Sequence, residues 1–106
     1  MKIIYNRFIP FGRNFLAINL FGVLFVKGPC DSVTINHEEI HTRQMRELLY
    51  LPFYVAYVVE WLFRLAQYRD FMKAYAAISF EREAYANQRD LGYLRRRRPY
   101  SFLKYL

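Results

Sequence analysis

Hydrophobic positions near the start of the chain fall into two runs typical of β-strands. Residues 2–8 and 15–26 are rich in Ile, Val, Leu and Phe, and residues 10–14 between them suit the unusual backbone angles of a turn. This pattern predicts a short N-terminal β-hairpin. After residues 27–31, which contain a Gly-Pro pair, strand-type composition gives way to helical composition.

Two longer helices are expected next. The first runs from about residue 35 to 49, and Ser32 or Thr34 is suited to cap it. The second follows Pro52, from about residue 53 to 67, and is apolar on nearly every face. A helix of that kind is either buried on several sides or in contact with lipid.

Shorter helical segments complete the chain. Asp70 is suited to cap a short helix, and a last helix, about residues 79–91, would end at Gly92, which tolerates the left-handed C-cap conformation. The sequence therefore predicts an α+β fold in which the hairpin precedes three to four helices. Residues 1–94 would form a single domain, and residues 95–106 a basic, aromatic C-terminal tail.

Length and composition narrow the class of protein. The chain has 106 residues, and 55% of them are hydrophobic. Independent domains typically need about 100–150 residues, so one domain is expected. The apolar content excludes a disordered chain, and the single cysteine, Cys30, excludes an internal disulfide.

Positive charge is concentrated at the C-terminal end. Residues 95–106 carry five basic and no acidic side chains, whereas residues 37–94 carry seven basic and eight acidic ones. A nucleic-acid footprint should line a folded face with basic residues, so we do not expect a nucleic-acid partner. The run Arg95–Arg98 is more typical of a solvated tail or of a contact with anionic lipid.

Apolar stretches at residues 15–26 and 48–63 are both shorter than the span of about 20 residues that a membrane requires. The second stretch contains tyrosines and Trp61, whose rings favour the depth of lipid headgroups. Residues 48–63 and Arg95–Arg98 are therefore candidate contacts with a membrane surface. No convincing signal peptide is found, and we expect a cytoplasmic or membrane-associated protein.

A metal-binding pattern falls inside the first expected helix. His37-Glu38-Glu39-Ile40-His41 reads H-E-x-x-H, and it contains the only two histidines of the chain. Residues four apart lie on one helix face, so both imidazoles can point at a single ion. Glu38 is rotated by about 100° from His37, where it can hold a water molecule beside the ion. The pattern predicts a zinc site.

Such a site needs a third protein ligand, and the chain offers no third histidine. Cys30 precedes the helix, and Glu60 lies in the apolar helix, where a buried carboxylate needs a partner. Glu81 and Glu83 lie on a later helix that can return antiparallel to the first. All four stay open as candidates at this point.

The two motifs together resemble the gluzincin branch of zinc metallopeptidases. More narrowly, His37-Glu38-x-x-His41-x-x-Gln44 with Phe80-Glu81-x-Glu83-Ala84-Tyr85 is similar to a group of small, uncharacterised bacterial zincin-like proteins. The resemblance covers roughly residues 34–90. It implies a minimal zincin-like core, in which the H-E-x-x-H helix packs against an antiparallel helix that carries the glutamate ligand.

In gluzincins an acidic residue four positions after the third ligand orients a ligating histidine. By that count the resemblance assigns the ligand position to Glu81, in preference to Glu83, and places Tyr85 where the acid should stand. A tyrosine offers a neutral hydroxyl in place of the carboxylate. Either the ligating histidine is oriented less strongly, or Tyr85 has another role, such as donating to an oxyanion. Tyr75 is a second candidate for such a donor.

The resemblance implies a zinc-dependent metallohydrolase of peptidase type, acting on a peptide or protein substrate. Glu38 would be the general base and Tyr85 a catalytic donor, with His37, His41 and Glu81 as the metal ligands. Strand 15–26 would offer its edge to an extended peptide. The small size of the chain keeps an alternative open, which is a noncatalytic metal-binding, membrane-surface or partner-binding protein.

Overall fold

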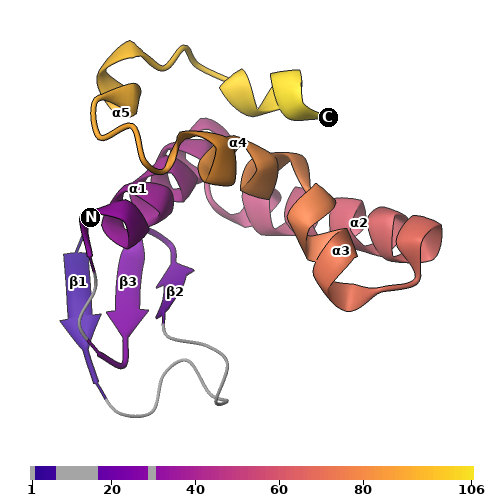
Figure 1. Ribbon diagram of the computed structural model, residues 1–106, viewed down its shortest axis with the longest axis horizontal. Helices are drawn as coiled ribbons and strands as arrows, with labels where there is room; N and C mark the ends of the chain where they lie inside the picture. Colours follow the sequence, from indigo (N-terminus) through magenta and orange to yellow (C-terminus); the bar gives the residue numbers. More distant parts are fainter. Residues whose placement is uncertain (1, 7–16, 29–30) are drawn as a thin grey trace.

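A computed structural model describes residues 2–6, 17–28 and 31–106 of the chain. It confirms the α+β class, with a three-stranded sheet followed by helices (Figure 1). The strands are β1 (Lys2–Tyr5), β2 (Ala17–Leu20) and β3 (Val23–Val26). The helices are α1 (Ser32–Glu47), α2 (Leu51–Tyr68), α3 (Phe71–Ala77), α4 (Ser79–Asn87), α5 (Tyr93–Arg96) and the 3₁₀ helix η1 (Ser101–Tyr105).

The strands pair differently from the expected hairpin. Strand order is β1-β3-β2, with β1 parallel and β2 antiparallel to β3. Residues 17–26 therefore form the hairpin by themselves, through a two-residue turn at Phe21 and Gly22, whose φ angles are +53° and +86°. Two positive φ values in such a loop are typical of the type I′ turn. The turn expected at residues 10–14 lies outside the described residues.

The N-cap residue of helix α1 lies one position before the first of the two expected cap residues. The carboxylate of Asp31 accepts a hydrogen bond of 2.8 Å from the backbone N–H of Thr34 and thereby caps the helix, a role that we had given to Ser32 or Thr34. The chain leaves α1 through Leu49 and Tyr50, both at positive φ, and enters α2 with a proline in its first turn.

Among the described residues, no single helix combines the length and the apolar character of a membrane span. Helices α1 and α2 meet both criteria only when they are taken together, and the chain bends by 110° between them.

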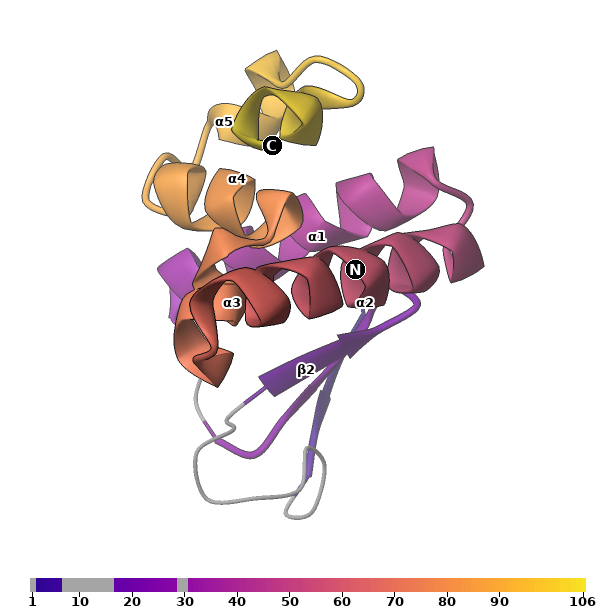
Figure 2. The same ribbon diagram turned by 90° about the vertical axis from the view of Figure 1, so that its right-hand side faces the viewer.

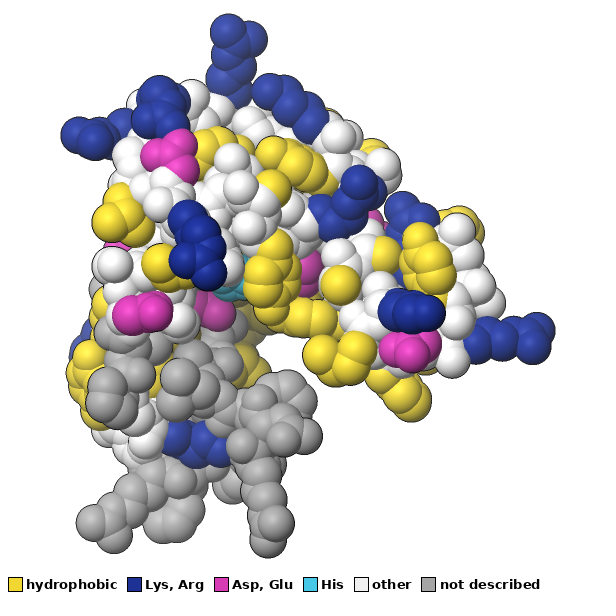
Figure 3. All heavy atoms as spheres, viewed as in Figure 1, with side chains coloured by type: hydrophobic (Ala, Val, Ile, Leu, Met, Phe, Trp, Pro, Cys, Tyr) yellow, Lys and Arg dark blue, Asp and Glu magenta, His cyan; other side chains and the backbone are white. Residues whose placement is uncertain are grey.

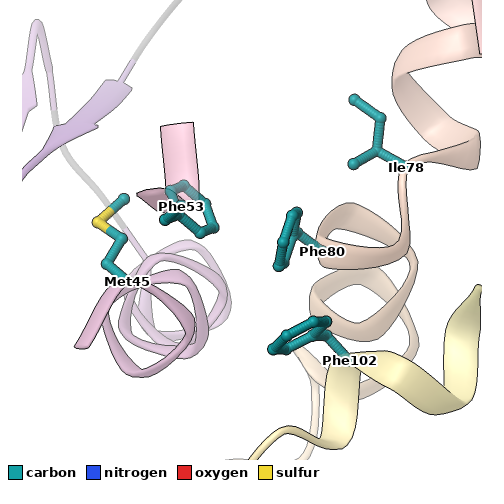
Figure 4. Packing of buried hydrophobic residues seen from close by; sticks show 5 residues of the cluster. All are labelled: Met45, Phe53, Ile78, Phe80 and Phe102. Carbon is teal, nitrogen blue, oxygen red and sulfur yellow. The ribbon is translucent and has the colours of Figure 1, made fainter. Parts of the chain in front are cut away.

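Aromatic side chains fill the core where α1, α2 and α4 meet. Phe80 lies between Phe53 and Phe102, with ring centroids 4.8 Å and 4.7 Å away (Figure 4). Burying a phenylalanine contributes about 1.5–3 kcal/mol. Because Phe102 belongs to this core, residues 95–106, which we expected to form a tail, pack against the rest of the fold.

Helix α4 returns antiparallel to α1, as expected. Asn36, near the start of α1, donates to carbonyl oxygens around the end of α4, at Asn87 and Gln88, whereas Gln44, near the end of α1, donates to the carbonyl oxygen of Phe80. In both views α4 lies between the α1–α2 pair and the C-terminal segment, and the sheet lies on the other side of that pair (Figures 1 and 2).

Candidate metal centre

Three donor atoms from α1 and α4 converge in the interior. The Nε2 atoms of His37 and His41 lie 3.1 Å apart, and Oε1 of Glu81 lies 3.2 Å from the first and 3.0 Å from the second. All three side chains are buried. Bonds of about 2.0–2.1 Å to a tetrahedral ion set its donor atoms about 3.3 Å apart, so these three atoms lie close to the spacing that a bound metal requires.

The other ring nitrogen of each histidine is paired with a glutamine. Nδ1 of His41 lies 2.8 Å from Oε1 of Gln44, and Nδ1 of His37 lies 2.9 Å from Oε1 of Gln88. A glutamine carbonyl oxygen only accepts, so each Nδ1 must carry the hydrogen and each Nε2 keeps its lone pair.

Gln44 itself is held in one orientation. Its side chain is fully buried, and its amide nitrogen donates to the carbonyl oxygen of Phe80 (3.0 Å) and to Oε1 of Glu83 (2.9 Å). The carbonyl end of Gln44 is therefore the end that faces His41. Outer contacts of this kind orient a metal-binding histidine and raise its basicity.

Lone pairs from three acceptor atoms thus meet at one point. Two neutral imidazoles and one carboxylate within 3.2 Å repel one another unless a cation or a proton lies among them. The same donor set, with a fourth position left for water, is typical of catalytic metal sites. The residues present therefore fit a divalent metal ion.

In the absence of metal a proton satisfies the cluster. Burial by itself disfavours the charged form of His41, but the Glu81 carboxylate outweighs burial and raises the pKa of His41 to about 9. Burial likewise opposes ionisation of Glu81, yet the charge on His41 and the hydrogen bonds from both histidines hold the pKa of Glu81 well below its ordinary value of 4.5. The surroundings of the cluster select a positive charge at its centre.

Tyr57 of α2 fixes the second oxygen of Glu81. Its hydroxyl donates to Oε2 at 2.7 Å. Burial, together with the nearby Glu81 carboxylate, raises the pKa of Tyr57 far above its ordinary value of 10, so the phenol stays a donor throughout the working range of pH. Glu81 is thereby oriented with Oε1 toward the histidines.

Glu83 is engaged elsewhere. Its carboxylate accepts hydrogen bonds from Nε of Arg97 (2.5 Å), from the Tyr93 hydroxyl (2.6 Å) and from Gln44. Arg97 is buried and also pairs with Glu47 through two hydrogen bonds of 2.8 and 3.0 Å. The structure therefore brings Glu81, and not Glu83, to the histidine pair.

The remaining ligand candidates lie apart from the cluster or outside the described residues. Glu60 accepts hydrogen bonds from the backbone N–H (2.5 Å) and the hydroxyl (2.8 Å) of Ser79, so its carboxylate caps the first turn of α4. This contact helps to set the position of α4, which carries Glu81. Cys30 is among the residues that the structure does not describe.

Glu38, the expected general base, is half-buried beside the cluster. Burial raises its pKa above the ordinary value of 4.5, and the neighbouring histidines act in the opposite direction. The Asn19 amide nitrogen donates to the carbonyl oxygen of Glu38 (3.0 Å) and to the hydroxyl of Thr42 (2.9 Å). These bonds fasten β2 to the turn of α1 that carries Glu38.

Tyr85 lies beside the histidines without orienting them. Its ring meets the His37 ring edge to face at 4.6 Å, and its hydroxyl lies 2.9 Å from that of Tyr75. The orienting bond to His37 comes from Gln88, seven residues after Glu81, where gluzincins use an acid four residues after the ligand. Tyr85 is about half exposed, so its hydroxyl lies near both the cluster and solvent.

Little of the histidine pair reaches the surface. Figure 3 shows a small patch of histidine side chain (cyan) between a basic and a hydrophobic side chain. His37 and His41 are only 7% and 5% exposed, so a small ligand such as water has a narrow approach to them.

Sequence reasoning missed several residues that hold the ligands in place. Tyr57, Gln88 and Arg97 have no spacing relative to H-E-x-x-H that would single them out. Gln44 entered the sequence analysis only as the last position of the H-E-x-x-H-x-x-Q pattern, without a contact assigned to it. The structure shows the contact.

Comparisons of the chain with protein-family models, with curated proteins and with solved structures find no match.

Proposed function

We propose that the protein is a zinc-dependent metallohydrolase of peptidase type. The observation that supports this function best is the convergence of the His37, His41 and Glu81 donor atoms, with the hydrogens of both imidazoles directed away from the centre. Two imidazoles and one carboxylate are preferred ligands of zinc, and this set is common in zinc hydrolases.

Zinc in such a site supplies a Lewis acid that lowers the pKa of water and polarises a carbonyl group. Glu38 takes the proton of the attacking water and delivers it to the leaving amine. Its half-buried position and raised pKa suit this exchange, because a general base works best when its pKa approaches the working pH.

Tyr85 and Tyr75 are the nearest candidates for steadying the oxyanion of the reaction. Their hydroxyls contact each other, so one of them can donate outward while the other accepts. Tyr57 is less suited to donate to the oxyanion, since its hydroxyl already donates to Glu81.

A peptide or protein is the proposed substrate class. Among the described strands β2 lies at the edge of the sheet, and Asn19 ties it to the Glu38 turn of α1. An extended peptide can add to such an edge through main-chain hydrogen bonds. That placement would carry a scissile amide past the general base.

Metal analysis combined with two variants tests the proposal. Purified protein should contain about one zinc per chain, and a His41→Ala variant should lose it. A Glu38→Gln variant should keep the zinc and lose nearly all hydrolysis of a fluorogenic peptide mixture, whereas Glu39→Gln, one position along the same helix, should retain both. Wild-type protein without zinc would overturn the metal centre. Zinc without any hydrolysis would leave the noncatalytic metal-binding alternative in its place.

A further inference from the structure

One face of α2 is apolar and exposed from Leu51 to Phe63. We define the α2 outer face as six side chains that are each 50–65% exposed: Leu51, Val55, Val58, Val59, Leu62 and Phe63. At 100° per residue they lie within an arc of about 140°. The opposite side of the helix enters the core, where Phe53 and Tyr57 contact Phe80.

Hydrophobic exposure continues past the end of α2. Phe71 and Met72, in the first turn of α3, are 68% and 70% exposed. Figure 3 shows hydrophobic and basic side chains side by side over this part of the molecule, on the right of the view. A contiguous apolar surface of this kind on a soluble domain marks an interaction site.

Positive charge borders this surface at its C-terminal end. Arg69, which follows α2 on the line of Leu62, is exposed, and the Arg64 guanidinium lies 5.5 Å from the centre of the Phe63 ring. The acidic side chain at this end is Asp70, and it is engaged with the backbone N–H groups of Met72 and Lys73. The border therefore favours an anionic partner.

We propose that the α2 outer face docks onto a membrane surface that carries anionic lipid. A helix with one aliphatic face and a cationic border is suited to the boundary between headgroups and acyl chains. There its aliphatic side chains contact the acyl chains and its cations contact anionic headgroups. The inference does not depend on the metal centre.

A second copy of the chain is a poorer occupant. Two α2 helices packed antiparallel through their outer faces would bring Arg69 of one copy to the start of α2 of the other. The acid near that end is Glu47, which already pairs with Arg97. With a net charge of +7 on each chain, such a pair lacks the charge complementarity that an anionic membrane offers.

The arginine run does not share this surface. Arg97 is buried between two carboxylates, and α5 lies beyond α4 when viewed from α2 in both orientations (Figures 1 and 2). The membrane contact that we expected from residues 48–63 together with Arg95–Arg98 is therefore proposed for the α2 side alone.

Flotation with lipid vesicles tests the proposal on the full chain. Wild type should float with phosphatidylcholine–phosphatidylglycerol vesicles. Val55→Glu combined with Leu62→Glu should reduce the floating fraction at least about tenfold, because a charge then enters the apolar layer. Leu103→Glu, at a leucine of η1 with a similar exposure of 54%, is the matched control and should float like wild type.

Charge variants test the border separately. Arg69→Asn should lower binding to anionic vesicles about fivefold, while Arg95→Gln with Arg98→Gln should leave it unchanged. All variants should keep the circular dichroism spectrum and the urea midpoint of wild type, which confirms folding. Wild type that does not float, or equal flotation of the Val55–Leu62 variant, would overturn the proposal. The proposal would also fail if light scattering showed that wild type is a dimer, that the Val55–Leu62 variant is a monomer, and that wild type does not bind vesicles.

Discussion

The side-chain carbonyl oxygen of Gln44 lies 2.8 Å from Nδ1 of His41, and both residues are buried on α1. Because the amide end of Gln44 is bound to Phe80 and Glu83, the carbonyl end has one direction available. A continuous set of contacts thus connects the imidazole of His41 through Gln44 and Glu83 to Arg97. The tautomer of the histidine is set by residues from α4 and the C-terminal segment.

Replacing Gln44 should therefore weaken metal binding without touching a metal-binding atom. We expect Gln44→Leu to lower the zinc affinity about 10–100-fold, since the Nδ1–H of His41 loses its acceptor. Competition with a chromophoric chelator measures the change. Gln88→Ala should act similarly through His37, and Gln67→Ala on the exposed side of α2 is the control. Folded Gln44 and Gln88 variants with wild-type affinity would contradict this role.

The two glutamates of α4 should separate metal binding from stability. Glu81→Gln should lower zinc affinity more than the roughly 100-fold that outer contacts contribute, because a ligand charge is lost. Glu83→Gln should keep most of that affinity. It should instead lose about 3 kcal/mol or more of unfolding free energy, because buried Arg97 loses a charged partner. Chelator competition measures the zinc affinity, and urea unfolding measures the stability. If Glu83→Gln lost the zinc affinity and Glu81→Gln lost the stability, Glu83 would be the ligand.

Local signals predicted the helices, but contacts between helices decided where one of them ends. We expected the last helix to run to residue 91 because Gly92 marks an end, and α4 ends at Asn87. The cause is Asn36 on α1, whose amide nitrogen draws the carbonyl oxygens of residues 87, 88 and 90 into its own hydrogen bonds. No pattern within residues 79–91 reports that contact.

Strand pairing was the least predictable part of the fold. A turn in the middle of residues 15–26 is signalled only by Gly22, inside an otherwise apolar run. Phe21 tolerates its positive φ in a site where its N–H donates to the Tyr54 hydroxyl (2.8 Å) and its ring packs on the Tyr54 ring. This partner lies 33 residues away, so the turn depends on tertiary contacts.

The histidine pair was predictable because its spacing is a property of one helix. Arg97 was not, because it stands in a run of four arginines and only the path of the chain after α5 decides which of them turns inward. Its partners Glu47 and Glu83 lie 50 and 14 residues away.

Arg97 should accordingly differ from its neighbours in the run. Arg97→Met leaves the buried carboxylate of Glu83 and the half-buried one of Glu47 without their cation, and we expect the unfolding free energy to fall by about 3–5 kcal/mol. Arg98→Met, at an exposed position one residue further, should change it by less than about 0.5 kcal/mol. Urea unfolding of zinc-loaded protein measures the stability of both variants. Equal urea midpoints would contradict a stabilising role for Arg97.

Removal of metal should make stability depend on pH above neutrality. In the metal-free chain the pKa of His41 is raised from 6.5 to about 9 by Glu81, against the effect of burial. The stabilisation that a raised histidine pKa gives to the folded state is fully present below the pKa of the unfolded chain, and it is lost as the pH rises through the pKa of the folded chain. The free energy of unfolding should therefore fall by on the order of 3 kcal/mol between about pH 6.5 and 9.5. We expect bound zinc to take the place of that proton, so the loaded protein should keep its stability over this range. Urea midpoints with and without chelator at about pH 6 and pH 9 measure the difference. Parallel pH profiles for the two forms would contradict a shared site for proton and metal, and chelated His41→Ala, which lacks the group, should lose this dependence.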